Sequence, residues 1–212
     1  MQTVVKTPDS QRHWRELYAA KPGATLSWYQ QIPDTSLSLI KNAGVKKTAR
    51  IIDIGGGTAR LADALLADGF QDITVLDIAE NALARTKARL GKETAAKIKW
   101  INADITRWQP QREYDLWHDR AVFHFLIRDT DVEVYKRALL QGLKPGGHLV
   151  IGTFAPEGPD HCSGLPVRRY SSDSLAEKLG HEFELVQSLT EVHTTPAGIL
   201  QRFLFCRFTR VA

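Results

Sequence analysis

The fold of this chain is decided by one stretch, Ile51-Ile52-Asp53-Ile54-Gly55-Gly56-Gly57-Thr58-Ala59-Arg60-Leu61. A β-branched apolar run leads into three consecutive glycines, and residues 62–66, which follow, favour a helix. Strand, glycine turn and helix in this order predict the opening of a βαβ unit. Glycine suits such a turn because it tolerates a positive φ and lets a ligand come close to the main chain.

The glycine turn fits neither of the two common phosphate-binding patterns. The dinucleotide fingerprint Gly-x-Gly-x-x-Gly requires a last glycine, and that position holds Arg60. The Walker pattern requires Gly-Lys-Ser/Thr after the turn, and Thr58-Ala59 stands there instead. An acid, Asp53, is separated from the first glycine only by Ile54. A carboxylate at that place favours a cationic ligand end, such as an amino group, over a phosphate.

Two further acids follow the next two predicted strands. The segment 72–77 is expected to be a buried strand that ends in Asp77, and the strand over 97–102 is followed by Asp104. A carboxylate at the end of the second strand can accept hydrogen bonds from both hydroxyls of an adenosine ribose. Because the carboxyl ends of parallel strands meet in one crevice, Asp53, Asp77 and Asp104 are expected to line the same site.

The pattern Asp53-x-Gly55-x-Gly57 resembles motif I of the class I S-adenosylmethionine-dependent methyltransferases, with Ala59 in place of the third glycine. The resemblance covers residues 51–210 and implies S-adenosylmethionine as the cofactor. It also implies that Asp104 accepts from the adenine amino group, that two isoleucines clamp the adenine ring, and that Trp28 walls the ligand. The expected cofactor-binding residues are Asp53, Gly55, Gly56, Gly57, Asp77, Ile78, Asp104, Ile105 and Trp28.

The segment 114–126 resembles the family's fourth motif, where methyl donor and acceptor meet. Its Asp119-Arg120 pair is most similar to the Asp-Lys version of lysine methyltransferases that act on elongation factor and on citrate synthase, and Arg120 departs from that version. We expect Asp119 to orient a cationic acceptor or the cofactor's ammonium, and His118 and His124 to be candidate proton acceptors. The expected catalytic residues are therefore Asp119, Arg120, His124 and His118.

The later sequence predicts how the sheet is completed. Leu143-Lys144-Pro145-Gly146-Gly147 is a tight turn before a fifth strand, and it is among the most recognisable stretches of these methyltransferases. Two last strands, over 183–190 and 200–208, suit the antiparallel hairpin that closes the methyltransferase sheet. The expected fold class is α/β, a Rossmann-like doubly wound seven-stranded sheet with an antiparallel last strand and an N-terminal helical cap.

The predicted division of the chain places the N-terminal helical cap in residues 1–47 and the cofactor-binding methyltransferase domain in residues 48–212, as one globular unit. Within the cap, Asp34 or Thr35 is expected to be the N-cap of a helix, because short oxygen-bearing side chains accept from free N–H groups there. Thr130 or Asp131 is expected to cap a later helix for the same reason.

Composition indicates the partners and the cellular compartment of the protein. The net charge is +4, but Lys and Arg are spread along the chain, which does not indicate a nucleic-acid partner. No apolar run reaches the roughly 18 residues of a membrane span, and residues 1–14 contain no hydrophobic signal segment. Cys162 and Cys206 do not form a disulfide framework and favour a reducing compartment. We therefore expect a cytoplasmic, monomeric enzyme without a membrane partner.

The methyl acceptor is expected to be a small molecule, because the chain adds no separate recognition domain; a protein lysine is the alternative. The leader and the loop over 155–170 are expected to define it. Less favoured are a protein that binds a metal or metalloid, an NAD-dependent oxidoreductase, and a module that keeps the cofactor without activity. The candidate metal ligands are His118, His124, His161, Cys162 and His193, but no pair has the spacing of a zinc motif, so no metal site is predicted.

Overall fold

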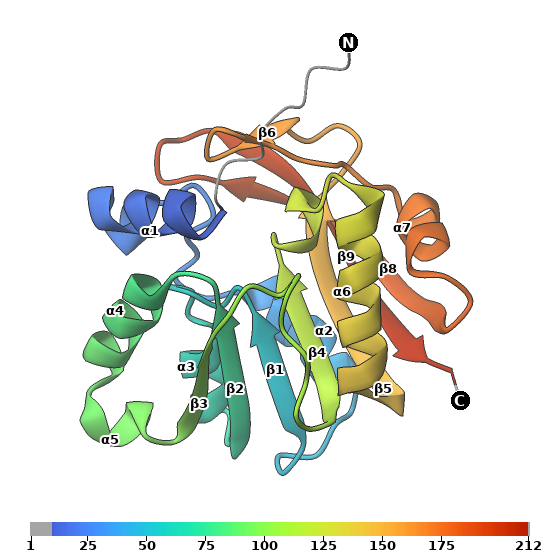
Figure 1. The fold of residues 1–212 in the computed structure, drawn as a ribbon, viewed down its shortest axis with the longest axis horizontal. Coiled ribbons are helices and arrows are strands. Elements are labelled where there is room, and N and C mark those ends of the chain that lie inside the picture. The colour runs from blue at the N-terminus through green and yellow to red at the C-terminus, as the bar shows by residue number, and fades with distance from the viewer. Residues whose placement is uncertain (1–9, 212) are drawn as a thin grey trace.

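The computed structural model describes residues 10–211 and shows one large sheet with helices on both faces (Figure 1). The strands of this sheet are β1 (Arg50–Ile54), β2 (Asp72–Asp77), β3 (Ile98–Asn102), β4 (Tyr114–Arg120), β5 (Leu143–Phe154), β8 (Phe183–Thr194) and β9 (Leu200–Arg210). Their order across the sheet is β3-β2-β1-β4-β5-β9-β8, and β9 runs antiparallel to both of its neighbours. This confirms the predicted seven-stranded sheet with an antiparallel last strand.

Strand β1 lies inside the sheet because its side chains are apolar on both faces. It pairs in parallel with β2 on one side and with β4 on the other. Ile51 and Ile52 point to opposite faces, and both are fully buried. A run of this kind is typical of a parallel strand covered by helices on both sides. The carboxyl end of β1, with its glycine turn, is therefore held at the centre of the sheet.

Helices form two layers, one on each face of the sheet (Figure 1). The first layer holds α2 (Asp34–Asn42), α3 (Leu61–Ala67) and α4 (Glu80–Leu90), with the short α5 (Lys92–Ala95) after it; the second holds α6 (Asp129–Gly142) and α7 (Ser172–Leu179). Leu39 of α2 and Leu65 of α3 share one hydrophobic core. Tyr135 of α6 and Leu175 of α7 share the core on the opposite face. The two cores confirm the doubly wound arrangement.

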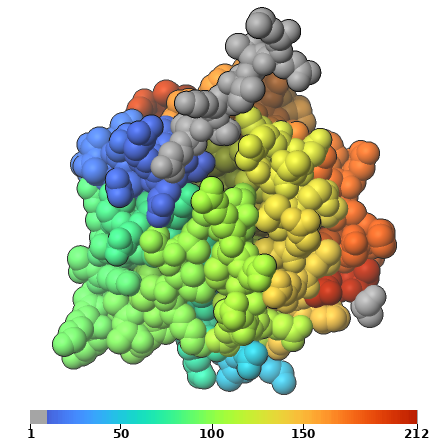
Figure 2. Space-filling model, in the orientation of Figure 1, coloured from blue at the N-terminus to red at the C-terminus, as the bar shows by residue number. Residues whose placement is uncertain are grey.

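The leader packs directly onto the domain. Helix α1 (Ser10–Ala20) rests on α4, because Asn81 donates to the carbonyl of Arg15 at 2.9 Å and Arg85 donates to the carbonyl of Lys21 at 2.7 Å. Figure 2 shows α1, in blue, seated on this part of the surface. The short 3-10 helix η1 (Gly23–Thr25) follows it, and a second 3-10 helix, η2 (Phe123–Phe125), follows β4. Residues 1–9 of the predicted cap lie outside the described residues.

Several predicted boundaries differ from the structure. Helices α2 and α6 begin at Asp34 and Asp129, after Pro33 and Arg128, so neither receives a side-chain cap. Their acids lie instead in the first turn, where negative charge favours the positive end of the helix dipole. The turn over 143–147 lies inside β5 as a bulge. The loop over 155–170 contains a small hairpin, β6 (His161–Cys162) and β7 (Leu165–Pro166). Within residues 10–211, no helix combines the length and hydropathy needed to cross a bilayer.

Candidate active site

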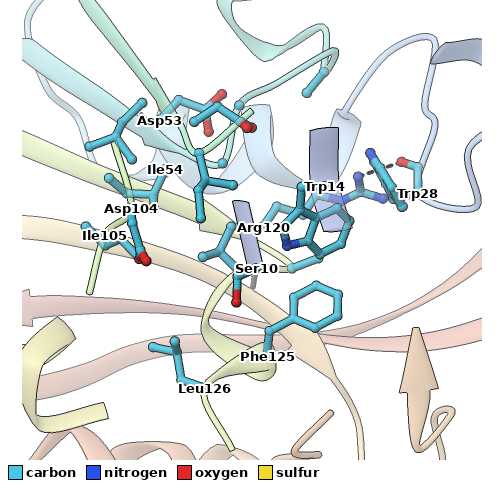
Figure 3. Close-up of a pocket in the computed structure, with 18 of the residues that line it drawn as sticks. Ser10, Trp14, Trp28, Asp53, Ile54, Asp104, Ile105, Arg120, Phe125 and Leu126 are labelled. Carbon is cyan, nitrogen blue, oxygen red and sulfur yellow. Dashed lines mark hydrogen bonds between the residues drawn. The ribbon is translucent and has the colours of Figure 1, made fainter. Parts of the chain in front are cut away.

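A cavity of about 1490 Å³ lies at the carboxyl ends of the parallel strands (Figure 3). Its walls come from the ends of β1 to β4 with the segments that follow them, from the leader, and from the β6–β7 hairpin. Ten of the predicted site residues line it, namely Trp28, Asp53, Gly55, Gly56, Asp77, Ile78, Asp104, Ile105, His118 and Arg120. Gly57, Asp119 and His124 do not. The structure therefore brings the three strand-end acids together, as expected.

The glycine turn leaves no room for side chains between two buried carboxylates. Gly55 has φ +68°, a conformation that favours glycine. A Cβ added at Gly56 would lie 2.5 Å from Asp53 Oδ2 and 2.7 Å from Val75 Cγ1. A Cβ at Gly57 would lie 2.7 Å from Asp77 Oδ2. The turn thus forms a cradle in which backbone and carboxylates face the cavity together.

Asp77, the last residue of β2, is almost fully buried at 4% exposure. Its Oδ1 accepts from the backbone N–H of Ala79 at 2.7 Å, which fixes the carboxyl group at the start of α4. Burial raises the pKa of Asp77 to about 7, the neighbouring charge of Asp53 adds to this rise, and the backbone N–H groups of Ala79 and Gly57 oppose it. A carboxylate with this surrounding can take up or release a proton near neutral pH.

Asp53 is held by a chain of buried hydrogen bonds that sequence reasoning did not identify. Strands β1 and β4 pair so that Asp53 and His118 are direct neighbours. His118 Nδ1 lies 2.7 Å from Asp53 Oδ1, and His118 Nε2 lies 2.9 Å from the hydroxyl oxygen of Ser36 on α2. All three side chains are at most 3% exposed. Both ring nitrogens of His118 are therefore engaged, and the histidine orients Asp53.

Asp119 and His124 lie behind the cavity wall. Neighbouring residues of a strand face opposite sides, so His118 and Arg120 face the leader while Asp119 faces α6. Asp119 accepts from the Tyr135 hydroxyl at 2.8 Å and from the backbone N–H groups of Val122 and Phe123 at 3.0 and 3.2 Å, and burial raises its pKa to about 6. These contacts tie the η2 turn to α6.

His124 is fully buried beside the ring of Phe154. Its Nδ1 accepts from the Phe154 backbone N–H at 3.4 Å. Burial lowers the pKa of His124 to about 3, and the positive charge of Arg120 lowers it further, so the ring is neutral. The geometry around Asp119 and His124 favours supporting roles for both over contact with reacting groups.

Arg120, at the end of β4, has a guanidinium group that is only partly used (Figure 3). Its Nη1 donates to the carbonyl of Trp28 at 2.8 Å, and its central carbon lies 5.3 Å from the ring centre of Phe203. Its Nε and Nη2 are buried and have no hydrogen-bond partner in the part of the chain that is described. An unpaired buried donor costs about 1–3 kcal/mol. Burial lowers the pKa of Arg120 to about 10, although Glu191 and Asp53 oppose this.

The remaining predicted cofactor residues complete the walls. Asp104 follows β3 and accepts from the backbone N–H and hydroxyl of Thr106 at 2.9 and 2.7 Å, which directs its carboxylate at the edge of the cavity. Ile78 and Ile105 line the cavity on the same side. Trp28 packs edge-to-face on Trp14 with ring centres 5.8 Å apart. These positions agree with an apolar slot next to the acids.

The five candidate metal ligands do not form one site. His118 is hydrogen-bonded to Asp53. The Nε2 atom of His193 lies 2.7 Å from the carbonyl oxygen of Ser27. His161 is largely exposed on the β6 strand. Among residues 10–211 there is no group of three or more His, Cys, Asp or Glu side chains placed to hold a metal ion. The geometry thus does not favour the metal-binding alternative.

Comparisons with known proteins agree with this geometry. The family model described as a methyltransferase domain matches residues 51–147. Nodulation protein S of Rhizobium tropici is 30% identical over 105 residues, which cover 50% of this chain and 43% of that protein. The alpha N-terminal protein methyltransferase 1 of Caenorhabditis elegans is 30% identical over 125 residues, which cover 56% of this chain and 53% of that protein. The chain therefore spans about half the length of these curated relatives.

Among solved structures, the 1,6-didemethyltoxoflavin-N1-methyltransferase of Burkholderia thailandensis, crystallised with S-adenosylhomocysteine, has the same fold. It superposes with a TM-score of 0.70 at 19% identity, covering 96% of this chain and 84% of that one. The family match over residues 51–147 and this shared fold agree with the predicted resemblance to the class I S-adenosylmethionine-dependent methyltransferases.

Proposed function

We propose that this protein transfers the methyl group of S-adenosylmethionine to a small-molecule acceptor. The observation that carries the proposal is the convergence of Asp53, Asp77 and Asp104, from the ends of three successive strands, on one cavity beside a glycine turn. Ligands of open α/β sheets bind at the carboxyl ends of the strands. An NAD-dependent oxidoreductase is disfavoured, because the methyltransferase model matches the glycine turn and the strands that follow.

The residues of the cavity fit this cofactor. Asp77 would hold the ribose hydroxyls, because a carboxylate fixed by a backbone N–H still has acceptor capacity. Asp104 would accept a hydrogen bond from the adenine amino group, and Ile78 and Ile105 would pack against the adenine ring. Asp53, oriented by His118, would face the ammonium. A Cβ at Gly56 would collide with Asp53 and Val75, so glycine at this position keeps the Asp53 carboxylate in place beside the main chain.

The bound cofactor supplies a methyl group on a sulfonium sulfur, which is a good leaving group. The protein's own contribution is chiefly to hold two reactants in a near-attack geometry, which can supply roughly 7–11 kcal/mol. His118 is the histidine that lines the cavity in the described chain, and both of its ring nitrogens are engaged. This supports an acceptor that is nucleophilic without a histidine base, such as a thiolate, a carboxylate or an amine that reaches the site uncharged.

The walls of the cavity support a small acceptor. Helix α1 contributes Trp14 and Tyr18, the loop after η1 contributes Trp28 and Tyr29, and the β6–β7 hairpin contributes Cys162. These segments cover the site from the side opposite the sheet. A folded protein surface would have to displace them to reach the strand ends. The size of the cavity, about 1490 Å³, leaves room for a cofactor and a second molecule of similar size.

A protein amine is the second candidate, supported by the similarity to the alpha N-terminal protein methyltransferase of Caenorhabditis elegans. In the sequence, the Asp119-Arg120 pair resembles a motif of lysine methyltransferases, which predicts a lysine acceptor. The carboxylate of Asp119 is occupied by Tyr135 and two backbone N–H groups, so its geometry does not support direct contact with a lysine ammonium. The small-molecule acceptor is therefore preferred.

The proposal is tested in two steps. Calorimetric titration with S-adenosylhomocysteine should give binding with a stoichiometry of one, and NADH should not bind. Release of S-adenosylhomocysteine is then measured over panels of thiols, amines, carboxylates and peptides with free N-termini or lysines, with the Asp77→Asn variant as the inactive control. Binding of NADH alone would contradict the cofactor assignment, and turnover of peptides alone would favour the second candidate.

A further inference from the structure

The cavity wall contains a cation, Arg120, whose buried hydrogen-bond donors are largely unused. A guanidinium group has five N–H donors. Arg120 donates from Nη1 to the Trp28 carbonyl, while its Nε and Nη2 are buried without a partner among the residues described. The ion pairs of the described chain do not include Arg120. No carboxylate of the described residues is therefore in direct contact with these two nitrogens.

The negative charges of Glu191 and Asp53 act on Arg120, but neither carboxylate forms an ion pair with it, and each is engaged by another side chain. Glu191 on β8 accepts from Gln30 at 2.7 Å, and Asp53 accepts from His118 at 2.7 Å. Phe203 presents its ring to the guanidinium, and this contact leaves the in-plane N–H donors free. The thiol of Cys162, also in the cavity wall, has a pKa raised by burial and is therefore protonated at neutral pH.

Arg120 lies on the side of the cavity away from the adenine-binding acids. The sheet order places β3, β2 and β1 on one side of β4, and β5, β9 and β8 on the other. Asp77 ends β2 and Asp104 comes after β3, whereas Arg120 contacts Phe203 on β9 and the leader carbonyl of Trp28. In Figure 3, Arg120 lies between Trp14 and Trp28, with Asp104 and Ile105 away from it.

We infer that Arg120 binds an anionic group of the methyl acceptor, so that the substrate class is a small molecule bearing a carboxylate or phosphate. This inference rests on the proposed function. Two free N–H donors on adjacent nitrogens, Nε and Nη2, match the bidentate geometry in which arginine binds carboxylate and phosphate oxygens. Trp14 and Phe125, which pack with ring centres 5.0 Å apart and line the cavity, provide an apolar wall for the body of the molecule.

A matched pair of probes tests the charge requirement. Benzoate and benzamide have nearly the same shape, but only benzoate is anionic; inorganic phosphate serves as a second anionic probe. Binding of each is measured by calorimetry and by the shift in melting temperature, in the presence of saturating S-adenosylhomocysteine. The wild-type protein should bind benzoate or phosphate, and benzamide at least tenfold more weakly than benzoate. Equal affinities for benzoate and benzamide, or no binding of either anion, would overturn the inference.

Two substitutions of Arg120 test whether its side chain binds the anion. Arg120→Met should weaken binding of the anionic probe at least tenfold, and Arg120→Lys, which keeps the charge but not the fork, should lose less. The matched control is Arg128→Met: Arg128 also lines the cavity, but its guanidinium is paired with Asp131 at 2.7 and 2.8 Å. This control should bind the anion as the wild type does. A loss in Arg120→Lys as large as in Arg120→Met would indicate a structural role and overturn the inference.

The cofactor itself carries a carboxylate, so its affinity is the deciding control. S-adenosylhomocysteine should bind Arg120→Met within about twofold of the wild-type affinity. If its affinity falls as far as that of the anionic probe, the cofactor's carboxylate is the anion that Arg120 binds, and the inference about the acceptor is overturned. If the wild-type protein does not bind S-adenosylhomocysteine at all, the proposed function fails, which is a result distinct from any effect at Arg120.

Discussion

The two halves of the cavity are built in different ways. In the half formed by β1 to β3, each polar group stands at the end of a strand and is fixed by a neighbour in space or by the adjacent backbone, as Asp77 is by Ala79. In the half formed by β4 and the strands beyond it, Arg120 is held by Trp28 and Phe203, which lie far from it in the chain. The first half has satisfied hydrogen bonds, and the second has buried donors without partners.

This difference suggests a division of labour. The half of the cavity whose polar groups are already fixed suits a single unchanging ligand, because few side chains have to be ordered when that ligand binds. A half assembled from the leader, a hairpin and a distant strand can change with few substitutions while the sheet stays the same. We therefore assign the cofactor to the first half and the acceptor to the second, and the following predictions test this assignment, beginning with the largest expected effect.

The strongest test is Asp77→Ala. Loss of two hydrogen bonds to a charged acceptor, about 1.5–3 kcal/mol each, should weaken S-adenosylhomocysteine binding by about 100-fold or more. The matched control is Asp72→Ala, at the opposite end of β2, where the carboxylate pairs with Arg112 and Lys99. Calorimetry should show unchanged affinity for this control. Retention of wild-type affinity in Asp77→Ala would refute the assignment of the first half to the cofactor.

The second test is the pH dependence of cofactor binding. Burial raises the pKa of Asp77 to about 7, so the free protein is protonated at this site below that pH. Ribose hydroxyls need the ionised acceptor, and the proton must therefore be released on binding. Affinity should fall by about tenfold per pH unit below pH 7 and level off above it. Calorimetry between pH 5 and 8 measures the slope; in Asp77→Asn the profile should be flat, and a persisting slope would assign the proton to another group.

A smaller effect is expected from Gly56→Ala. The new Cβ would stand 2.5 Å from Asp53 Oδ2, which forces the carboxylate from its place. Overpacking of this kind costs about 1–3 kcal/mol of unfolding free energy, measured by chemical denaturation. Gly23→Ala provides the control, because a Cβ there would meet no atom closer than 3.4 Å. Equal stability of the two variants would show that the cradle is not tightly packed.

The smallest effect is expected from Ser36→Ala, which leaves one nitrogen of His118 without its partner at 2.9 Å. One lost hydrogen bond is worth about 1 kcal/mol, so cofactor affinity should fall by several-fold as Asp53 becomes less well oriented. Ser38→Ala, on the exposed side of the same helix, should have no effect on calorimetric affinity. If both variants bind alike, Ser36 does not act through Asp53.

The same contrast explains what could be predicted from sequence. The strand over 72–77 and its terminal acid were predicted at their true bounds, because apolar pattern, strand end and carboxylate are adjacent in the chain. The contacts of Ser36 with His118 and of Trp28 with Arg120 span 82 and 92 residues, and no local pattern encodes them. Sequence alternation along β4 places Asp119 and Arg120 on opposite faces, but it does not reveal which face adjoins the cavity.

The aromatic lining has a practical consequence. Three of the five tryptophans of the chain, Trp14, Trp28 and Trp108, stand at the cavity, whereas Trp117 is buried in the core beneath. A molecule that enters alters the polarity around these three indole rings, whereas the other two, Trp100 and Trp117, do not line the cavity. The protein thus carries its own fluorescent reporter, and ligand libraries can be screened by emission alone, without labelling.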